Sequence, residues 1–424
     1  MKTIPYWLDD FPRPADLPTA PLPEAVDVAV VGGGYTGLGA ARALAQSGYR
    51  VAVLEQGNIG FGASAMNGGQ VGPGVKLDIQ SVFKQYGPEV GREVWQATLD
   101  AIAALEETLH SEQIEADYTP TGHLVCAFRP KNYPALAKSI DWMDKHLGCG
   151  DKFRLVPPEE MRTELGSDIY FGGMVEEFGG GLHPAKYLFG LARATARAGA
   201  LVVENTRVER LERNGDGFLL QTSQGQLTAD AVLLATNGYT GPLVPAIQRG
   251  VFTVGSYMIV TEPLPEALQR DLVPNNRVMY DTKNFLNYFR LMPDGRMSMG
   301  GRNNLSPNLD LMESARALAH RMVEIFPQLK GVPITHTWTG RLGITFDLMP
   351  HIGQAGGVYY AYGYGGHGVA LAAHLGREAA RLMTGQTQRS AFAEVKHLKY
   401  PFYRGNPWFL PFAASYYRFL DRVA

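Results

Sequence analysis

The sequence predicts an α/β protein with α+β character, in which a Rossmann-like domain is interleaved with a second domain built on an antiparallel sheet. Three observations support this prediction. A short apolar strand, a glycine turn, a helix and a second strand follow each other within residues 26–54. A second glycine-rich run follows at 57–74, and a strand, a glycine turn and a long helix recur at 357–383. Pieces of one nucleotide-binding sheet are therefore expected near both ends of the chain.

The composition excludes several classes of protein. The 424 residues allow two or three domains, and 45% hydrophobic against 19% charged residues is typical of folded chains. The net charge of −2 argues against nucleic-acid binding, which needs a basic surface. Cys126 and Cys149 are too few for a disulfide framework or a zinc site, so no metal is expected. Because residues 1–18 lack a signal-peptide pattern and no long apolar run occurs, the sequence predicts a cytoplasmic protein without a transmembrane segment.

The individual elements follow from local patterns. Strand 26–31 is rich in β-branched residues, helix 37–47 in alanine and leucine, and strand 49–54 is again apolar. Apolar residues at helical spacing predict further helices at 88–122, 134–147, 184–198 and 310–326. Apolar or alternating runs predict strands at 201–204, 218–236, 252–302 and 358–362.

These elements predict a discontinuous domain organisation. Six prolines make residues 1–25 an extended arm. The nucleotide-binding domain is assigned to residues 26–87, 180–250 and 336–388, and the substrate domain to 88–179 and 251–335. The tail 389–424 is aromatic-rich, with Arg404, Arg418 and Arg422 interleaved. It is expected to pack on the body or on a partner subunit, and peripheral membrane contact is the alternative.

The first glycine turn predicts a dinucleotide site. In GGGYTG, Gly32 permits the tight turn, Gly34 lets a pyrophosphate approach the backbone, and Gly37 lets helix and strand pack closely. Tyr35 and Thr36 open the helix, whose N-terminus supplies N–H groups and positive potential. Glu55, followed by Gln56, ends the second strand, where an acidic residue accepts hydrogen bonds from ribose hydroxyls and disfavours NADP.

The second glycine-rich run favours FAD over NAD. A nicotinamide cofactor that dissociates in each catalytic cycle needs no second glycine-rich binding loop, whereas a permanently bound flavin extends past such a loop. Ser64 is a candidate phosphate ligand. The other candidate cofactor contacts of this loop are Gly62, Asn67, Gly68, Gly69 and Gln70. A flexible surface loop is the alternative.

The third glycine turn, YGYGGHG, offers a second helix N-terminus. Its dipole and free N–H groups suit the N1–C2=O edge of a reduced, anionic flavin. The candidate cofactor contacts here are Gly363, Gly365, Gly366, His367 and Gly368.

These runs together resemble the FAD-dependent D-amino-acid-oxidase-like superfamily, which includes glycine and sarcosine oxidases, and are most similar to its γ-glutamylputrescine oxidase branch. The matching segments occur in the family's order and include GASAMNGGQ, GGLHPAKYLFGLARATARAGA, LLATNGYT, YFRLMPDGRMSMGGR and YGYGGHGVALA. The resemblance adds Val208, Thr236 and Asn237 to the expected cofactor contacts. The branch often has Gly-Arg where this chain has Ala65 and Met66, which removes a cation near the cofactor. The cysteine that attaches the flavin in sarcosine oxidases has no counterpart here, so non-covalent FAD is implied.

The resemblance implies oxidation of a carbon–nitrogen bond. A hydride passes from the carbon next to nitrogen to flavin N5, and the imine hydrolyses to a carbonyl compound and an amine. The implied substrate is a γ-glutamyl-polyamine, an N-substituted amino acid or an imino acid, and oxygen or another acceptor reoxidises the flavin. Two alternatives are a D-amino-acid-type dehydrogenase that passes electrons to a membrane acceptor, and a flavin-binding subunit of a larger complex.

Seven residues are candidates for the substrate side of the flavin. His367 is placed to touch flavin or substrate, and Trp338 and Tyr364 are expected to form an apolar wall. The remaining candidates are Tyr257, Tyr288 and Arg302 on strands of the second domain, and Lys76 as an isolated cation that could aid oxygen activation. For each, core packing or a solvated side chain is the alternative. His351 and Asp347 are expected to be structural.

Overall fold

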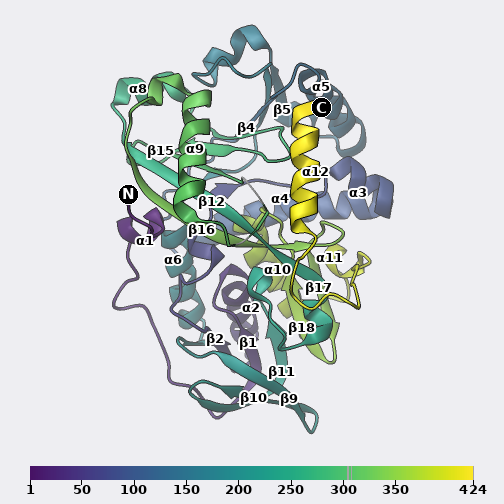
Figure 1. Ribbon diagram of the computed structural model, residues 1–424. Coiled ribbons are helices and arrows are strands. Elements are labelled where there is room, and N and C mark those ends of the chain that lie inside the picture. Colours follow the sequence, from purple (N-terminus) through teal and green to yellow (C-terminus); the bar gives the residue numbers. More distant parts are fainter. Residues whose placement is uncertain (303–304, 307, 424) are drawn as a thin grey trace.

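The computed structural model describes residues 1–302, 305, 306 and 308–423. Within these residues the strands form two sheets of eight strands each and one small two-stranded sheet. In Figure 1 the sheet that contains β1 (Ala25–Val31) lies in the lower half of the molecule, and the sheet that contains β12 (Val251–Pro263) lies in the upper half. The predicted α/β class with two sheet domains is confirmed.

The lower sheet has a parallel centre with an antiparallel hairpin attached. Its strands, in spatial order, are β17 (His351–Ala355), β18 (Val358–Tyr362), β11 (Gly225–Leu234), β1, β2 (Val51–Leu54) and β8 (Leu201–Val203), with β9 (Val208–Asn214) and β10 (Gly217–Thr222) joined to β11. β1 pairs in parallel with β2 and β11. All four residues of β2 are buried, which explains why this strand is an unbroken apolar run.

Helices α2 (Tyr35–Gln46) and α10 (Gly368–Met383) cross closely beside this sheet. Glycines at the crossing make the approach possible. A Cβ added at Gly39 would lie 2.5 Å from the Ala373 carbonyl oxygen, and one at Gly376 would lie 2.1 Å from the Thr36 oxygen. The helices that follow the first and the third glycine turn are therefore held in one rigid arrangement.

The upper sheet is antiparallel at every neighbouring pair except one. Its spatial order is β16 (Ile334–Thr345), β12, β15 (Arg296–Gly301), β14 (Tyr288–Leu291), β13 (Val278–Asp281), β4 (His123–Cys126), β6 (Gly173–Glu176) and β5 (Phe153–Val156). The exception is the parallel pair of β13 and β4, where the two separate chain segments of this sheet meet.

Side-chain alternation gives the upper sheet two different faces. One face carries Leu124, Met279 and Met299 and forms a buried core under α9 (Leu311–Ile325). The other face shares its core with the lower half of the molecule, where Met258 and Trp338 cluster with residues of α2 and α10. This second face closes the space between the two sheets.

The remaining elements connect or cover the two sheets. The other helices are α1 (Tyr6–Asp10), α3 (Ile79–Tyr86), α4 (Pro88–Ser111), α5 (Asn132–Leu147), α6 (Pro184–Arg197), α7 (Pro245–Gln248), α8 (Glu266–Leu272), α11 (Ala391–Glu394) and α12 (Leu410–Val423), and β3 (Gln70–Val71) pairs with β7 (Gly180–Gly181). Among the helices of the described residues, none is long and apolar enough to cross a membrane.

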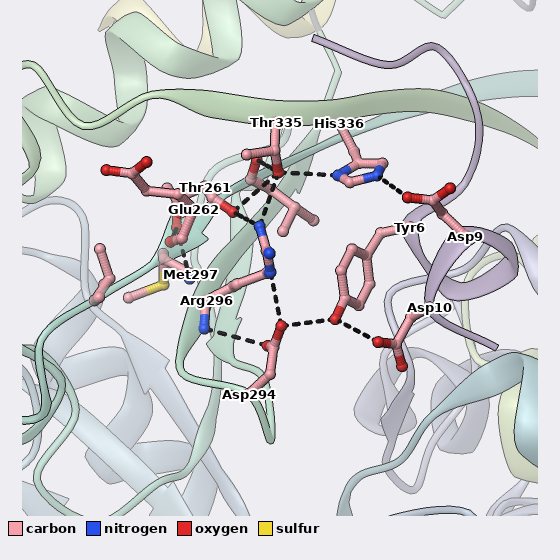
Figure 2. Close-up of polar contacts among 12 residues, drawn as sticks. Tyr6, Asp9, Asp10, Thr261, Glu262, Asp294, Arg296, Met297, Thr335 and His336 are labelled. Atoms are coloured by element: carbon pink, nitrogen blue, oxygen red, sulfur yellow. Dashed lines mark hydrogen bonds and ion pairs between the residues drawn. The ribbon is translucent and has the colours of Figure 1, made fainter.

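The expectation of a wholly extended N-terminal arm is wrong for its first part. Pro5 precedes the helix α1, and Trp7 in this helix is completely buried. Figure 2 shows how polar contacts fasten α1 to the upper sheet: the Tyr6 hydroxyl donates to Asp294 at 2.7 Å, and His336 Nε2 lies 3.0 Å from the Asp9 carboxylate. Prolines surround this helix without interrupting it, because proline is tolerated just before a first turn.

Two predicted domain boundaries also differ from the structure. Residues 336–345, assigned to the nucleotide-binding domain, lie in β16, which pairs with β12 in the upper sheet. Helix α4, assigned to the substrate domain, packs against α10, and its Ile102 and Leu105 belong to the core that also contains Leu38 of α2. The chain therefore crosses between the two halves more often than the sequence pattern indicates.

The C-terminal tail packs on the body of this chain. Leu410 and Ala414 of α12 are buried against Val254 and Ile344. The Asp421 carboxylate accepts hydrogen bonds from backbone N–H groups of the segment before β14, at 2.8 and 3.0 Å. The exposed aromatic side chains of α12 are Phe412, Tyr416, Tyr417 and Phe419.

Candidate active site

The turn between β1 and α2 forms one wall of a deep groove with a cavity volume of about 410 Å³. Gly32 has φ +111°, and a Cβ there would lie 2.8 Å from the Ala235 oxygen. A Cβ at Gly37 would lie 1.9 Å from the Gly32 oxygen. Gly34 is the N-cap of α2 and lines the groove itself. Side chains at these three positions would collide with the turn or fill the groove. Because glycine has no side chain, the N-terminus of α2 stays open to an anionic ligand.

Glu55 lies at the end of β2 beside this turn. Its carboxylate accepts hydrogen bonds from Gly33 N at 2.8 Å and from Gly57 N at 3.0 Å. Burial raises the pKa of Glu55, and these two hydrogen bonds act against that shift. The carboxylate lines the groove together with Gln56, in position to accept from the hydroxyls of a ribose.

Part of the second glycine run also lines the groove. Ser64 Oγ accepts from Tyr35 N at 3.1 Å, so its hydroxyl stands at the start of α2. The Asn67 side chain donates to the Ala63 oxygen at 3.2 Å and accepts from Gly69 N at 2.8 Å, which fixes the loop. Gly62, Ser64 and Asn67 all face the groove.

The last residues of this glycine-rich run contact the upper sheet and the segment before α6, whereas the sequence predicts that they contact the cofactor. A Cβ at Gly68 would lie 2.9 Å from Tyr288, and one at Gly69 would lie 2.2 Å from the Leu182 oxygen. The Gln70 side chain donates to the Met279 oxygen at 3.3 Å. These three residues join the loop to the upper sheet, and none of them is among the described residues that line the groove.

The third glycine turn forms the opposite wall. Asn237 Oδ1 accepts from Gly363 N at 3.0 Å, and the Tyr364 hydroxyl lies 2.7 Å from Thr36 Oγ1. Gly365, Gly366 and Gly368 line the groove with Thr236 and Val208. Tyr364 therefore lines the groove and ties the two turns together, whereas the sequence predicts it in an apolar wall on the substrate side.

Many residues that line the groove were not predicted from the sequence. Thr206, Tyr239 and Arg341 are among them, and the Arg341 guanidinium lies 5.6 Å from the centre of the Tyr239 ring. Tyr239 and Arg341 occur in the motifs LLATNGYT and WTGRLG, which carry the family resemblance. Their place in these two motifs is the signal by which Tyr239 and Arg341 could have been identified.

The strand register separates the candidates on the upper sheet. Tyr288 lies opposite Gly300, which in turn lies opposite Met258, so Tyr288 shares the face that meets the lower half. Tyr257 is the neighbour of Met258 and therefore points to the other face, where its hydroxyl accepts from Leu309 N at 2.9 Å. The expectation that Tyr257 contacts substrate is wrong.

Trp338 is also not a wall of an open pocket. Only 2% of its surface is exposed, and its indole N–H donates to the Met66 oxygen at 2.9 Å. Trp7 donates in the same way to the Asn67 oxygen at 2.8 Å, and the two rings meet edge to face. Both indoles therefore hold this loop through hydrogen bonds to its backbone carbonyl oxygens.

We expect Trp7→Phe to weaken this support. The variant keeps an aromatic ring but leaves the buried Asn67 carbonyl without its donor, at a cost of about 1–3 kcal/mol. The melting temperature should fall, and the bound cofactor should dissociate faster. Trp408→Phe is the control, because Trp408 is 70% exposed. Unchanged cofactor release in Trp7→Phe would contradict the role of α1 in holding the loop.

A second cavity, of about 170 Å³, lies beside the third glycine turn. His367 lines this cavity and not the groove. Its Nδ1 is buried without a hydrogen-bond partner among the described residues, and burial, together with the charge of Lys76, lowers the pKa of His367 to about 4. His367 is therefore a neutral imidazole at the boundary between the two spaces.

Lys76 and Arg302 are half-buried cations near this boundary. The stem of Lys76 packs on the turn, since a Cβ at Gly365 would lie 2.6 Å from Lys76 Cβ. Burial, reinforced by the charge of Arg302, lowers the pKa of Lys76 to about 8. Burial also lowers the pKa of Arg302. The Tyr288 hydroxyl lies 2.9 Å from Ser256 Oγ, on the face of the upper sheet that meets the lower half of the molecule.

Comparison with known proteins identifies the family. The family model described as FAD dependent oxidoreductase matches residues 27–382. The chain belongs to this family. It is 36% identical to the gamma-glutamylputrescine oxidoreductase of Escherichia coli (strain K12), over 94% of this chain and 93% of that protein.

Glycine oxidases are further relatives. The chain is 26% identical to glycine oxidase of Geobacillus kaustophilus (strain HTA426), over 84% of this chain and 92% of that protein. The crystal structure of glycine oxidase from Geobacillus kaustophilus superposes with a TM-score of 0.74 at 22% identity, over 89% of this chain and 100% of the other. The family resemblance and the FAD cofactor expected from the sequence are thus confirmed.

The residues of the groove fit FAD. Gly34 leaves room at the N-terminus of α2 for a pyrophosphate, the Ser64 hydroxyl stands beside it, and Glu55 is placed for a ribose. The Gly363–Gly368 turn adds a second helix N-terminus where α10 begins. The chain is an FAD-dependent oxidoreductase of the amine oxidase and dehydrogenase type.

We expect the FAD to be released intact when the protein is precipitated with acid. Cys126 is completely buried in the core of the upper sheet, and neither cysteine is among the described residues that line the groove. A covalent thioether to the flavin therefore has no donor there. Measuring FAD in the supernatant checks this, and yellow colour that stays with the pellet would contradict it.

Proposed function

We propose that the chain oxidises the carbon–nitrogen bond at the primary amine of γ-glutamylputrescine or of a closely similar γ-glutamyl diamine. The similarity to gamma-glutamylputrescine oxidoreductase over nearly the full length of both chains carries this proposal. The second cavity supports it. Among the described residues that line this cavity there is no lysine or arginine, so the cavity suits the amino end of such a substrate rather than its glutamyl carboxylate.

The protein's own residues orient and enclose the amine. FAD, when bound, accepts the hydride from the carbon next to the nitrogen. His367 stays neutral in its buried position and therefore adds no charge that would repel the amine. Val75, Trp95 and Met143 give the cavity apolar walls that exclude water from the methylene chain.

Anaerobic bleaching of the flavin tests the proposal. The holoenzyme is mixed without oxygen with γ-glutamylputrescine, putrescine, glycine or D-alanine, and loss of the visible flavin absorption is followed. We expect γ-glutamylputrescine to bleach the flavin fastest at equal concentration. Faster bleaching by glycine or D-alanine would overturn the proposal, and no bleaching by any amine would favour a flavin-binding subunit. Hydrogen peroxide release in air then tests oxygen as the electron acceptor.

A further inference from the structure

The cavity beside His367 has an unusual charged residue in its wall. Helices α3, α4 and α5 and the strands β5, β6 and β13 surround this space. Glu176 is the last residue of β6, where it lies opposite His123 of β4 and Phe153 of β5. It therefore points to the face of the upper sheet that also carries Tyr280 and Tyr288.

Glu176 is buried and has no hydrogen-bond or ion-pair partner among the described residues. Its exposed surface is 7%, and none of the hydrogen bonds or ion pairs among the described residues involves its carboxylate. Burial raises the pKa of this carboxyl to about 8, with no neighbouring charge opposing the shift. An unpaired carboxylate in such a place destabilises the fold, because desolvation disfavours the charged form.

The other buried acids of the described chain are all explained by their contacts. Glu164 forms ion pairs with Arg154 and Arg277, Asp281 accepts from Asn287, and Asp347 bonds to His351. At the cavity itself, Asp78 caps helix α3 by accepting from Ser81 N at 2.9 Å. Glu176 has no contact of this kind among the described residues, so its carboxylate is available to a group from outside the chain.

The other walls of the cavity show which partner fits. Three aromatic residues, Trp95, Phe153 and Tyr280, line it together with Glu176. Aromatic faces attract cations, and an alkylammonium group next to a buried carboxylate gains both interactions. Val75 and Met143 provide apolar surface for the carbon chain behind such a group.

We propose that Glu176, Trp95, Phe153 and Tyr280 form a binding site for the protonated amino group of the substrate. This proposal rests on the proposed function for the identity of the amine, but the site itself is expected to bind any small alkylammonium ion. Glu176 supplies the counter-charge and the three rings enclose the cation. Because His367 closes the cavity toward the cofactor groove, an amine held by Glu176 lies next to the turn that lines that groove.

Binding of tert-butylammonium to the oxidised holoenzyme tests the site directly. The carbon next to nitrogen in this ion carries no hydrogen, so binding is measured without turnover, by calorimetry or by the change in the flavin spectrum. We expect Glu176→Gln to raise the dissociation constant by about tenfold or more, as for loss of a charge-assisted hydrogen bond. The affinity for tert-butanol, which has the same shape without the charge, should not change. An equal affinity for tert-butylammonium in Glu176→Gln and wild type would overturn the proposal.

Two further variants separate binding from a general disturbance. Glu177→Gln removes the neighbouring carboxylate, which is exposed and pairs with Arg277, and should leave the affinity unchanged. Phe153→Leu keeps an apolar side chain but removes one ring, and should weaken tert-butylammonium binding roughly threefold. FAD content and melting temperature should not fall in Glu176→Gln, because glutamine keeps the shape and removes only the buried charge. A loss of FAD in that variant would indicate a structural role and contradict the proposal.

The outcomes also distinguish this site from the proposed substrate. If tert-butylammonium binding depends on Glu176 but γ-glutamylputrescine does not bleach the flavin, the ammonium site stands and the proposed substrate is wrong. If γ-glutamylputrescine is oxidised with the same KM by Glu176→Gln and wild type, the proposed function stands and the ammonium site is wrong. A higher KM with a smaller change in kcat is the result expected for a binding residue.

Discussion

Protein purified with valine at position 34 should be colourless and contain no FAD. Gly34 is the N-cap of α2 and lines the groove, and its Cβ would already lie 2.9 Å from Ser64 Oγ. The two methyl groups of valine would extend further into the space that a pyrophosphate needs in order to reach the helix N–H groups. Because that contact fixes the dinucleotide, we expect its loss to abolish binding rather than weaken it slightly.

The measurement is the ratio of flavin to protein after purification with added FAD. Gly48→Val is the matched control at the opposite end of α2. No atom of the described residues lies within 4 Å of its added Cβ, and its φ of +88° makes the substitution the more strained of the two. Gly48→Val should therefore lose stability but keep FAD. A wild-type flavin ratio in Gly34→Val would show that the turn does not hold the cofactor.

Local glycine patterns made the glycine turns that line the groove predictable. Each turn needs backbone positions without a side chain, and Gly32 and Gly37 meet carbonyl oxygens so closely that no other residue fits. The sequence carries that requirement directly. The same reasoning fails at Gly69, which meets the Leu182 oxygen but is not among the described residues that line the groove. A glycine shows that something approaches its backbone, but not what approaches it.

The substrate side was less predictable because it depends on strand register. Tyr257 and Met258 are adjacent, and a shift of one residue exchanges the two faces of the sheet. The region 252–302 has apolar residues on both faces of the sheet. Its sequence pattern therefore does not show which residues face the lower half of the molecule and which face α9. Glu176 was missed for the same reason, since only the pairing with β4 and β5 distinguishes it from the exposed Glu177.

The buried helix at the N-terminus shows a further limit. The prolines of residues 1–25 favour an extended chain locally. The burial of Trp7 in the core and its hydrogen bond to the Asn67 carbonyl oxygen nevertheless stabilise a helix there. Burying a large aromatic side chain stabilises a fold by several kcal/mol, roughly 3–5 judged from its truncation. Tertiary contacts of this size override the local preference of a few residues, and they cannot be read from the arm itself.

Valine at position 366 should slow the enzyme strongly while leaving most of the FAD bound. Gly366 has φ +117°, a region that β-branched residues rarely adopt, so valine must displace the turn. No atom of the described residues lies within 4 Å of the added Cβ, and Gly366 lines the groove, so the side chain itself would occupy cofactor space. The turn at residues 32–37 is untouched and should retain FAD at saturating concentration.

The effect on rate follows from what the displaced turn provides. Its N–H groups and the N-terminus of α10 direct positive potential into the groove, beside the cavity that His367 lines. Loss of one preorganised donor at such a site costs about 3 kcal/mol, or roughly a hundredfold in rate. Allowing for partial relaxation of the turn, we expect anaerobic flavin bleaching by γ-glutamylputrescine to slow by about tenfold or more.

Gly385→Val distinguishes this effect from backbone strain alone. Gly385 follows the other end of α10 with φ +71°, and its added Cβ also meets no atom of the described residues within 4 Å. The two variants thus carry the same substitution at a positive φ, but of the two glycines only Gly366 borders the groove. Both should melt at a lower temperature, and only Gly366→Val should bleach slowly with its FAD in place. Wild-type bleaching in Gly366→Val would mean that the 363–368 turn lies away from the reacting part of the cofactor.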